Sequence, residues 1–304
     1  MEQRSGDDVE RAIVGNRAGP GWVRVAHGLH RRPGCDDVTA WQTLLPTSAA
    51  FSHLTAAQLH GWWSPELPPG LPVLVDQPRA DARSRRAGIR VTRTALAVPW
   101  VLIGGVRVAT PAHTLLACAR DLALLDLVVL VDAALRAGCT ADEIATAAAH
   151  GSNGAPRLRR ALAMADVRSE SPWETLLRVL HVSVGAPVVP QHVVRTADGA
   201  FVARGDLWLP GTRVLHEYDG AVHRTAQTHA ADLRRDRALT ATGWTRRGYV
   251  ASDLCQSPGT VLRDIDATLG RRHRPERIRR WLALLAASTY SPSGRARLQA
   301  RLTA

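Results

Sequence analysis

The first half of the chain mixes short alternating segments with helical ones. Apolar residues recur at helical spacing from His53 to His60, and this segment stops at Gly61. Two short runs rich in β-branched residues, Val73–Val75 and Ile89–Arg93, flank an Arg-rich loop and predict strands. Three helices are predicted next, at about 110–122, 124–137 and 141–149, and Thr110-Pro111 is a typical start for the first.

The pattern changes after Gly151-Ser-Asn-Gly154, the clearest linker signal in the chain. A short basic helix is predicted at 156–164, and an apolar stripe predicts an amphipathic helix at 171–184. Three strands are predicted at 188–195, 201–209 and 213–218, because an Asp-Gly or Pro-Gly turn signal follows each of them. A long helix at about 225–241, a strand at 244–250 and a helix at 258–269 complete this region.

These elements predict an α/β protein with a C-terminal domain, in which helices flank a mixed sheet, and a smaller mixed α+β N-terminal domain. Residues 1–40 are expected to contain a helix near Val9–Val14 and a short basic β-ribbon, and residues 41–150 form the α+β region. Residues 151–167 are a linker with the short basic helix, residues 168–270 form the C-terminal domain, and residues 271–304 form a basic helix and a polar tail.

Charge is distributed unequally between the two halves. The chain has 39 basic residues, all of them Arg, and a net charge of +12. Residues 1–150 hold 15 Arg and 14 acidic residues (15 − 14 = +1), whereas residues 151–304 hold 24 Arg and 13 acidic residues (24 − 13 = +11). A polyanionic partner, most commonly nucleic acid, is therefore expected to bind the second half. A genome-wide preference for Arg would explain the absence of Lys, but not this asymmetry.

Composition disfavours several classes of protein. No stretch approaches 18 consecutive apolar residues, and the first residues, MEQRSGDDVERA, are too polar for a signal peptide. The four cysteines are far apart and include no C-x-x-C pair, which argues against a zinc module and against a disulfide framework. The sequence therefore predicts a cytoplasmic protein without a membrane segment.

Three acidic residues in the strand region are candidates for a metal site. Glu217 and Asp219 are two apart in one strand, so both point to one face of the sheet, and Asp206 lies on the neighbouring strand. Their mutual repulsion is several kcal/mol at an effective dielectric constant of about 20, and a hard cation such as Mg²⁺ or Mn²⁺ would relieve it. His223, four residues after Asp219, could act as a general acid or base or orient a water molecule.

Each of these residues also has an ordinary structural explanation. Asp219-Gly220 alone is most often a hairpin turn, and a single His such as His223 is more often a surface residue than a catalyst. Ser171-Pro172-Trp173-Glu174 matches a capping box with Pro at the first helical position, which accounts for Glu174 without any catalytic role. The order of these signals along the chain is more specific than any one of them.

Five short segments occur in a fixed order between about residues 168 and 256: Ser171-Pro-Trp-Glu174, Gly205-Asp206-Leu-Trp208, His216-Glu-Tyr-Asp-Gly-Ala-Val-His223, Arg235-Asp236 and Gly243-Trp244. Together they resemble a restriction-endonuclease-like family that is related to the very-short-patch-repair (Vsr) mismatch endonucleases of the PD-(D/E)XK superfamily. The resemblance implies an α/β fold with a mixed sheet and metal-dependent cleavage of DNA phosphodiester bonds.

The resemblance also implies roles for particular residues. Asp206 would be the principal metal ligand, Glu217 the second acidic position with Asp219 beside it, and His223 the active-site histidine. Glu174 matches the acidic residue of the first helix, and Arg235-Asp236 the charged pair on the helix after the site. The superfamily's E-x-K lysine is Asp219 here, and the Vsr-like branch also lacks that lysine and uses His. The arginines expected to contact the DNA backbone are Arg204, Arg224, Arg234, Arg235 and Arg237.

Segments of the first half resemble AbiEi-type antitoxins, whose members are transcriptional regulators. These segments are Ser52-His-Leu-Thr-Ala-Ala57, Thr110-Pro-Ala-His-Thr-Leu-Leu116 and Val131-Asp-Ala-Ala-Leu135. The resemblance implies an N-terminal winged helix-turn-helix, of which residues 1–40 would be a remnant, with Gly28–Arg32 at the end of the wing. Ordinary helix packing is the simpler explanation for the first two segments.

The sequence therefore predicts a DNA endonuclease that depends on Mg²⁺ or Mn²⁺ and acts in repair, defence or toxin–antitoxin biology, with DNA and a cognate toxin as partners. The alternative is a DNA-binding regulator or antitoxin that retains a nuclease fold without catalysis. A protein-interaction module is disfavoured by the charge of +11 in the second half.

Overall fold

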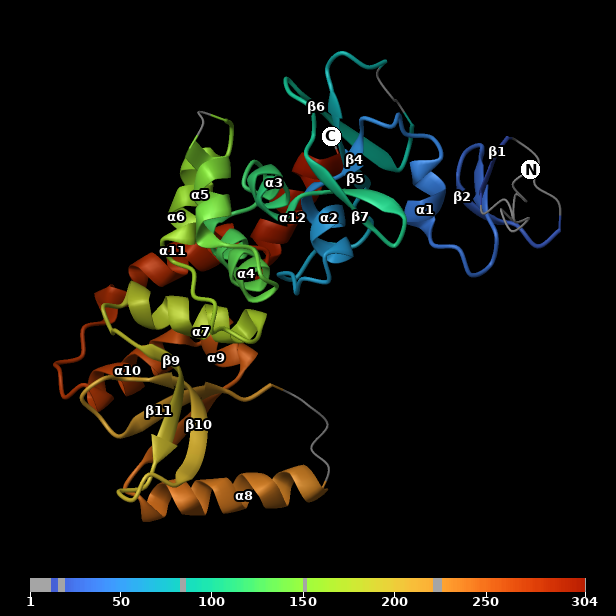
Figure 1. Ribbon diagram of the computed structural model, residues 1–304. Coiled ribbons are helices and arrows are strands. Elements are labelled where there is room, and N and C mark those ends of the chain that lie inside the picture. Colours follow the sequence, from blue (N-terminus) through green and yellow to red (C-terminus); the bar gives the residue numbers. More distant parts are fainter. Residues whose placement is uncertain (1–11, 16–19, 83–85, 150–151, 221–225, 304) are drawn as a thin grey trace.

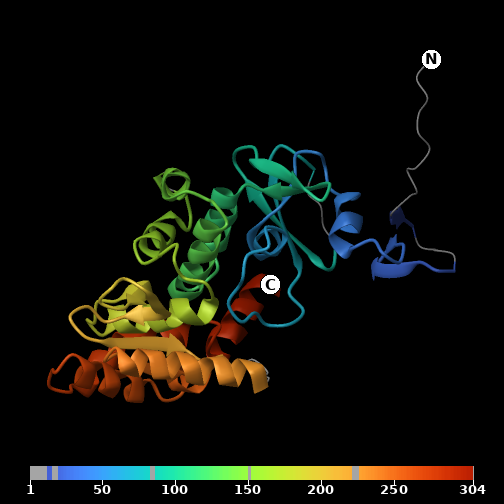
Figure 2. The same cartoon turned by 60° about the horizontal axis from the view of Figure 1, so that its bottom comes forward.

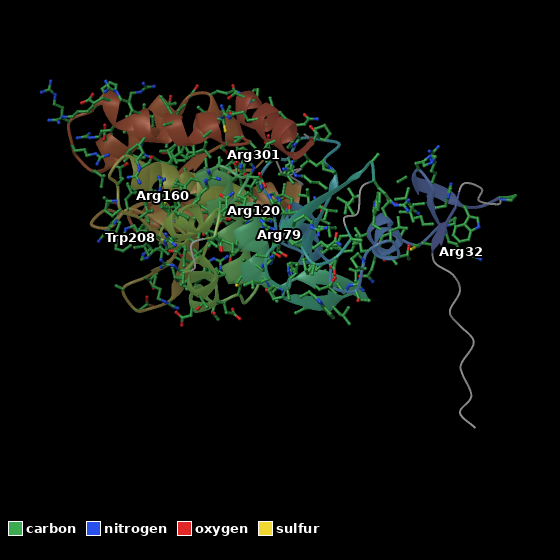
Figure 3. The ribbon with its side chains drawn as sticks, turned by 90° about the horizontal axis from the view of Figure 1, so that it is seen from above. Arg32, Arg79, Arg120, Arg160, Trp208 and Arg301 are labelled. Atoms are coloured by element: carbon green, nitrogen blue, oxygen red, sulfur yellow. The ribbon has the colours of Figure 1, made fainter. Side chains whose placement is uncertain are left out.

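The computed structural model describes residues 12–15, 20–82, 86–149, 152–220 and 226–303. Three β-sheets with helices between and beside them make a mixed α/β molecule, as the sequence predicts (Figure 1). The smallest sheet lies apart at one end, and Figure 3 shows Arg32 there, remote from Trp208 of the third sheet. Within the described ranges, no helix has both the length and the apolar character needed to cross a bilayer.

The N-terminal sheet has the order β1-β3-β2 and is antiparallel. Its strands are β1 (Ala12–Val14), β2 (Val23–Ala26) and β3 (Leu29–Arg31). The ribbon predicted around residues 22–32 is therefore confirmed. The helix predicted near Val9–Val14 is wrong over residues 12–14, because this segment pairs with β3 and the ladder of backbone hydrogen bonds outweighs a weak helical pattern.

The second sheet is mixed and has the order β6-β5-β4-β8-β7. Its strands are β4 (Ala50–Phe51), β5 (Val73–Pro78), β6 (Ile89–Thr94), β7 (Trp100–Ile103) and β8 (Val106–Ala109). The pairs β5–β6 and β4–β8 are parallel, and the other two pairs are antiparallel. The helices α1 (Asp37–Gln42) and α2 (His53–Leu59) pack beside it.

A layer of helices connects this sheet to the third one. It consists of α3 (Pro111–Cys118), α4 (Leu124–Arg136), α5 (Ala141–Ala149) and α6 (Ala155–Leu162). The predicted start of α3 is confirmed, with Thr110 at the N-cap and Pro111 at the first helical position. The helix α4 is buried along most of its length, so it forms the centre of this layer.

The third sheet is mixed, has the order β12-β11-β10-β9, and is parallel at β11–β12 alone. Its strands are β9 (Val189–Arg195), β10 (Phe201–Trp208), β11 (Val214–Tyr218) and β12 (Thr245–Tyr249). The accompanying helices are α7 (Pro172–Ser183), α8 (Ala226–Ala241), α9 (Ala251–Cys255) and α10 (Pro258–Thr268). Figure 2 shows the long helix α8 running along this sheet, where it contacts β10 and β12.

The C-terminal segment is folded back onto the body of the molecule. A 3₁₀ turn (Pro275–Ile278) leads into α11 (Arg279–Ala287) and α12 (Pro292–Thr303). The predicted polar tail is therefore wrong, because Leu298 and Leu302 lie four residues apart on one face of α12 and are buried. The side chain of Arg301 also forms an ion pair with Asp121.

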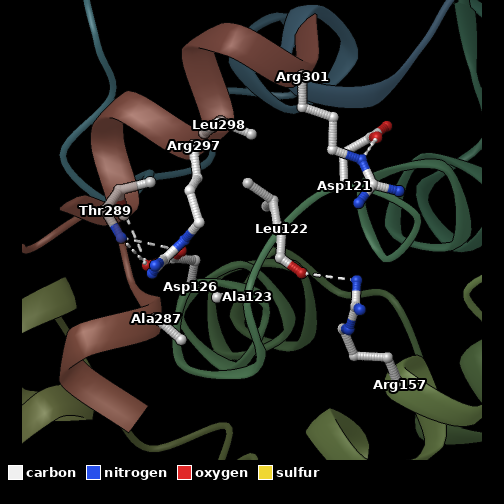
Figure 4. Close-up of a pocket in the computed structure, with 11 residues that line it drawn as sticks. Asp121, Leu122, Ala123, Asp126, Arg157, Ala287, Thr289, Arg297, Leu298 and Arg301 are labelled. Carbon is white, nitrogen blue, oxygen red and sulfur yellow. Dashed lines mark hydrogen bonds and ion pairs between the residues drawn. The ribbon is translucent and has the colours of Figure 1, made fainter. Parts of the chain in front are cut away.

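Polar contacts line the seam between this segment and α4, around a cavity of about 230 Å³ (Figure 4). The buried carboxylate of Asp126 accepts hydrogen bonds from the backbone N–H and hydroxyl of Thr289 (3.1 Å each) and from the hydroxyl of Ser288. Arg157 donates to the carbonyl oxygen of Leu122 at 2.9 Å. The C-terminal segment is thus held by the hydrogen bonds to Asp126 as well as by the buried Leu298 and Leu302 of α12.

One hydrophobic cluster crosses the boundary predicted at residues 151–167. It contains buried side chains from Leu54 to Leu302, so α4, α7 and α11 share a common core. A buried ion pair reinforces the contact between α4 and α7, because a guanidinium nitrogen of Arg178 lies 2.6 Å from Oδ2 of Asp132. The hydroxyl of Thr175 donates to the same carboxylate at 2.7 Å.

Residues 52–57 and 110–116 meet at the buried carboxylate of Asp76. It accepts hydrogen bonds from the hydroxyl of Ser52 at 2.8 Å and from Arg120 at 3.1 Å, and Nε2 of His113 lies 2.9 Å away. Burial by itself would raise the pKa of Asp76, but His113 and Arg120 lower it below its usual value. A buried charge with these partners is a structural reason for the polar residues of both segments.

Two buried histidines lie between α7 and the third sheet. Nδ1 of His181 lies 2.7 Å from the carbonyl oxygen of Leu177, so Nδ1 carries the proton and Nε2 is free to accept. Nε2 then accepts a hydrogen bond from Nδ1 of His216 at 2.8 Å. Burial lowers the pKa of His181 to about 4 and, together with His181, the pKa of His216 to about 2.

This pair makes the fold sensitive to acid. Both folded pKa values lie below the unfolded value of about 6.5, so the stability from the neutral pair is complete above pH 6.5 and is lost as the pH falls. We expect the free energy of unfolding to fall between pH 6 and 4 by up to about 1.4 kcal/mol per pH unit for each histidine. Urea denaturation should show a weaker pH dependence for His216→Gln, and an unchanged one for the exposed His27→Gln. Equal pH dependence in wild type and His216→Gln would contradict this assignment.

Candidate functional site

The acidic residues singled out in the sequence lie on the helix α7 and on or directly after the strands β10 and β11 of the third sheet. Glu174 lies in the first turn of α7, Asp206 in β10 and Glu217 in β11, and Asp219 follows directly after β11. They lie close together, because the charge of Asp206 raises the pKa values of Glu174 and Glu217, and the charge of Asp219 raises those of Asp206 and Glu217. The predicted site residues His223 and Arg224 lie outside the described residues.

Asp206 connects β10 to the end of β11. Its Oδ2 accepts a hydrogen bond from the backbone N–H of Tyr218 at 2.9 Å. Burial raises the pKa of Asp206, the Tyr218 N–H and Arg235 partly offset this, and Asp219 and Glu170 raise it further. The carboxyl group therefore retains its proton more readily than an ordinary aspartate.

Glu217 is the most strongly perturbed acid of the site. Its residue is 4% exposed, and burial is the main reason why its pKa rises to about 7. Arg235 and Arg246 lower this pKa, whereas the neighbouring Asp206 and Asp219 raise it. Strongly shifted acids that share one location are a common mark of functional sites.

Two arginines hold Glu217 and Asp219 together. Arg235 of α8 bonds to Oε1 of Glu217. One guanidinium nitrogen of Arg246, in β12, lies 3.3 Å from Oε2 of Glu217 and 2.8 Å from Oδ1 of Asp219. The expectation that Glu217 and Asp219 face the same way is confirmed, because they share this nitrogen. We call this arrangement of Arg235 and Arg246 around Glu217 and Asp219 the arginine bracket. Nε of Arg246 also bonds to Asp236 of α8 at 3.0 Å, so the arginine bracket involves both residues of the predicted Arg235-Asp236 pair.

Arg246 was not predicted from the sequence, because no local signal marks it. It lies in a strand, Thr245–Tyr249, that is too short and polar for its alternation to be informative. The parallel pairing of β11 with β12 places Arg246 opposite Leu215, and its long side chain then reaches both acids further along β11. This pairing could not be read from the sequence.

Of the arginines expected to contact DNA, Arg235 contacts Glu217 directly, and Arg204 lies beside Arg235. Arg204 forms an ion pair with Glu170 at 2.8 Å, and its carbonyl oxygen accepts a bond from Arg235 at 2.6 Å. Arg234 and Arg237 are exposed on α8. The structure thus places Arg204 and Arg235 at the site and Arg234 and Arg237 on its outer helix.

Glu174 has a capping role and a second set of contacts. The hydroxyl of Ser171 accepts a hydrogen bond from the Glu174 N–H at 3.2 Å, as a capping box requires. The Glu174 carboxylate instead accepts from the N–H of Glu170 at 2.9 Å and from the amide of Gln191 at 2.8 Å. Burial and the nearby Asp206 raise its pKa. Helix capping therefore accounts for part of the environment of Glu174 and not for all of it.

Gln191 is a residue of the site that sequence reasoning missed. Its backbone has φ of +53°, which is uncommon for a residue other than Gly, and its side chain reaches Glu174 from β9. No spacing or composition marks such a residue. Strained backbone of this kind persists where surrounding structure enforces it, often at functional sites.

The carboxylate oxygens suit a hard cation in their chemistry, but their arrangement does not fit one. In the part of the chain that the structure describes, no three His, Cys, Asp or Glu side chains are placed to hold a metal ion. Both oxygens of Glu217 and one oxygen of Asp219 face guanidinium groups instead. Mg²⁺ or Mn²⁺ therefore stays a prediction, and no reaction step is derived through it.

Comparisons with known proteins leave the family open. No family model matches the chain. Two Mycobacterium tuberculosis proteins, the uncharacterized protein MT2308 of strain CDC 1551 / Oshkosh and the uncharacterized protein Rv2248 of strain H37Rv, are each 29% identical over 196 residues, 62% of this chain and 67% of theirs. The crystal structure of the RV2827C protein from M. tuberculosis is 15% identical and covers 58% of this chain and 73% of its own, with a TM-score of 0.34.

The position of Asp219 depends on a glycine in the neighbouring strand. A Cβ atom added to Gly248 would lie 1.8 Å from Oδ2 of Asp219. We expect Gly248→Ala to displace Asp219 from Arg246 and to lower the free energy of unfolding by about 1–3 kcal/mol. Thermal unfolding measures this loss.

A double-mutant cycle separates this contact from a general effect on the strand. In an Asp219→Ala background, Gly248→Ala should cost clearly less than in wild type. Gly259→Ala is the matched control, because a Cβ atom there meets nothing within 4 Å. A cost of Gly248→Ala that is the same in both backgrounds would show that Asp219 does not lie against Gly248.

Proposed function

We propose that the region of residues 168–270 binds DNA and hydrolyses its phosphodiester bonds at the site formed by Glu174, Asp206, Glu217 and Asp219. The observation that carries the proposal is the convergence of four carboxyl groups, three of them with raised pKa values. Repulsion among these acids is offset by Arg235 and Arg246, and acids with raised pKa values that share one location are a common mark of functional sites. The sequence resemblance to Vsr-like endonucleases supports the same function.

The residues of the site suit the two tasks that backbone hydrolysis requires. Arg204 and Arg235 supply positive charge beside the acids, where a phosphate group of DNA would lie. Glu217, with a pKa of about 7, can accept or donate a proton close to neutral pH. Gln191 and the Glu170 N–H hold the Glu174 carboxylate in place at the edge of the site.

DNA is the proposed partner because of charge. The excess of Arg lies in residues 151–304, which include Arg234 and Arg237 on the exposed side of α8. A positive surface attracts a polyanion at long range and contacts the phosphates without regard to base sequence. A cognate toxin stays part of the proposal on the resemblance to AbiEi-type antitoxins alone, and a cytoplasmic location on the composition of the sequence.

A second candidate function is a DNA-binding regulator that does not cleave. It is favoured by the arginine bracket, because Arg235 and Arg246 already neutralise the acids that a metal ion would need. In this case the carboxylates would position the arginines and α8, and the nuclease-like fold would serve as a binding surface. Activity measurements distinguish the two candidates.

We expect the full-length protein to nick or linearise supercoiled plasmid when Mg²⁺ or Mn²⁺ is added, and not in the presence of a chelator. Asp206→Asn should lower the rate by about two orders of magnitude or more, because it removes a charge at the centre of the site. Asp198→Asn is the matched control, since Asp198 lies in the exposed β9–β10 turn. Gel assays of plasmid topology measure these rates.

Two outcomes would overturn the hydrolytic proposal. One is an Asp206→Asn variant that cuts plasmid as fast as wild type. The other is a wild-type protein that binds DNA but cleaves nothing with either metal, which would leave the regulator as the function of this region.

DNA binding itself should depend strongly on salt. If four to six phosphates are neutralised, the slope of log K against log salt concentration is about −4 to −5. Arg237→Gln should make this slope shallower by about one, because the exposed Arg237 would lose one phosphate contact. Arg79→Gln, an exposed change in the nearly neutral half, should leave it unchanged. Fluorescence anisotropy in chelator measures the slope, and a value near zero would contradict the charge argument.

A further inference from the structure

The strand β7 lies at the edge of the five-stranded sheet and carries exposed apolar side chains. Among the described residues, β7 pairs with β8 and has no strand on its other side. Leu102 is 64% exposed, Trp100 42% and Val101 39%, and Leu96, just before the strand, is 81% exposed. These four large side chains fall within seven residues, so they form a cluster and not the scattered exposure of an ordinary surface.

The sequence of β7 is typical of a strand with neighbours on both sides. Trp100 and Leu102 point to one face of the sheet and Val101 and Ile103 to the other, so both faces are apolar. Natural edge strands usually carry charges or prolines that block pairing with another strand. Residues 95–103 contain no charged side chain, and Pro99 lies before the strand begins.

The nearest charge is also turned away from this edge. Arg107 of β8 is paired with Leu102, but its guanidinium group bonds to the carbonyl oxygens of Ala49 at 3.0 Å and of Pro46 at 3.2 Å. The side chain of Gln42 also holds the hairpin of β7 and β8 in place. The Gln42 amide N–H donates to the carbonyl oxygen of Gly105 at 2.8 Å, and the Gln42 side-chain oxygen accepts from the Arg107 N–H at 2.6 Å. The edge is thus apolar and firmly held.

A cavity of about 930 Å³ lies beside the strand. Leu96, Ala97 and Pro99 line it on the side of β7, and Leu116 and Ala117 of α3 line it on the other. Its wall also includes the charged residues Arg93, Arg120, Asp142 and Glu143. The exposed region is therefore broader than one strand and includes the loop that precedes it.

We propose that β7 pairs with β7 of a second copy of the chain, which joins the two five-stranded sheets across a two-fold axis. With the axis beside residue 101, antiparallel pairing places Val101 of one copy opposite Val101 of the other, and Trp100 opposite Leu102, so that each pair lies on one face of the joined sheet. Every exposed apolar side chain of the strand then gains an apolar partner, and the free backbone groups gain hydrogen bonds.

The distribution of charge favours a second copy as the occupant of this edge. Residues 1–150, which include β7, carry a net charge of +1, so two copies can approach through this half with little repulsion. Approach through residues 151–304 would bring +11 against +11. An acidic protein partner would be attracted to the positive half and not to this neutral edge. This inference does not depend on the proposed hydrolysis.

Sedimentation velocity of the full-length protein over a range of micromolar concentrations tests the proposal. We expect the mass to rise to twice the 32.9 kDa of the chain. Leu102→Lys should weaken self-association by about tenfold or more, because it places a charge at the centre of the pairing. Phe201→Lys is the matched control, since Phe201 is also 64% exposed but lies in β10, and it should leave the dimer unchanged.

A second variant covers the case in which Leu102→Lys does not fold. Leu96→Lys changes the loop before the strand, where the side chain is almost fully exposed, and should weaken the dimer without affecting the sheet. A wild-type protein that stays at 32.9 kDa throughout overturns the proposal. So does a dimer that both lysine variants leave intact, or one that Phe201→Lys weakens as much as they do.

Discussion

The bracket that Arg235 and Arg246 form around Glu217 and Asp219 is the interaction on which the candidate site depends. Without these guanidinium groups, acids on neighbouring strands would repel one another and separate. The bracket explains several features of the fold, because it requires β12 to lie parallel to β11 and α8 to pack against β10 and β12. It also explains a glycine at residue 248, because a Cβ atom there would overlap the Asp219 carboxylate.

The site rests on a scaffold that extends well beyond its own region. Glu174 is held at the start of α7, and α7 is fixed to α4 through the buried pair of Arg178 and Asp132. The C-terminal segment completes the same core, because α11 contacts α4 and because Leu298 and Leu302 of α12 are buried in it. The acids therefore occupy a rigid position, which suits a site whose chemistry depends on fixed distances. It also means that the full chain is the appropriate material for studies of DNA binding.

The sequence predicted most elements of the fold because local signals were strong. Thr110-Pro111 and Ser171-Pro172 mark helix starts, and the Asp-Gly and Pro-Gly turns separate β9, β10 and β11 where expected. The two-residue strand β4 was missed because two residues carry no periodicity. The helix α12 was missed because its many polar residues mask the pair of leucines that it buries. Of the site, the acids were predictable from their spacing, whereas Arg246 and Gln191 depend on strand pairing and on an unusual backbone conformation.

The protonation of Glu217 is the most direct test of the account, because it reports burial, the neighbouring acids and the arginine bracket together. Carbon-13 NMR of the glutamate side-chain carboxyl groups, followed over pH, measures it in the intact protein. The account predicts a pKa of about 7 for Glu217, and a lower value in Asp206→Asn, since the Asp206 charge raises it. A Glu217 that titrates near the ordinary value of about 4.3 and does not respond to Asp206→Asn would contradict the proposed cluster of acids.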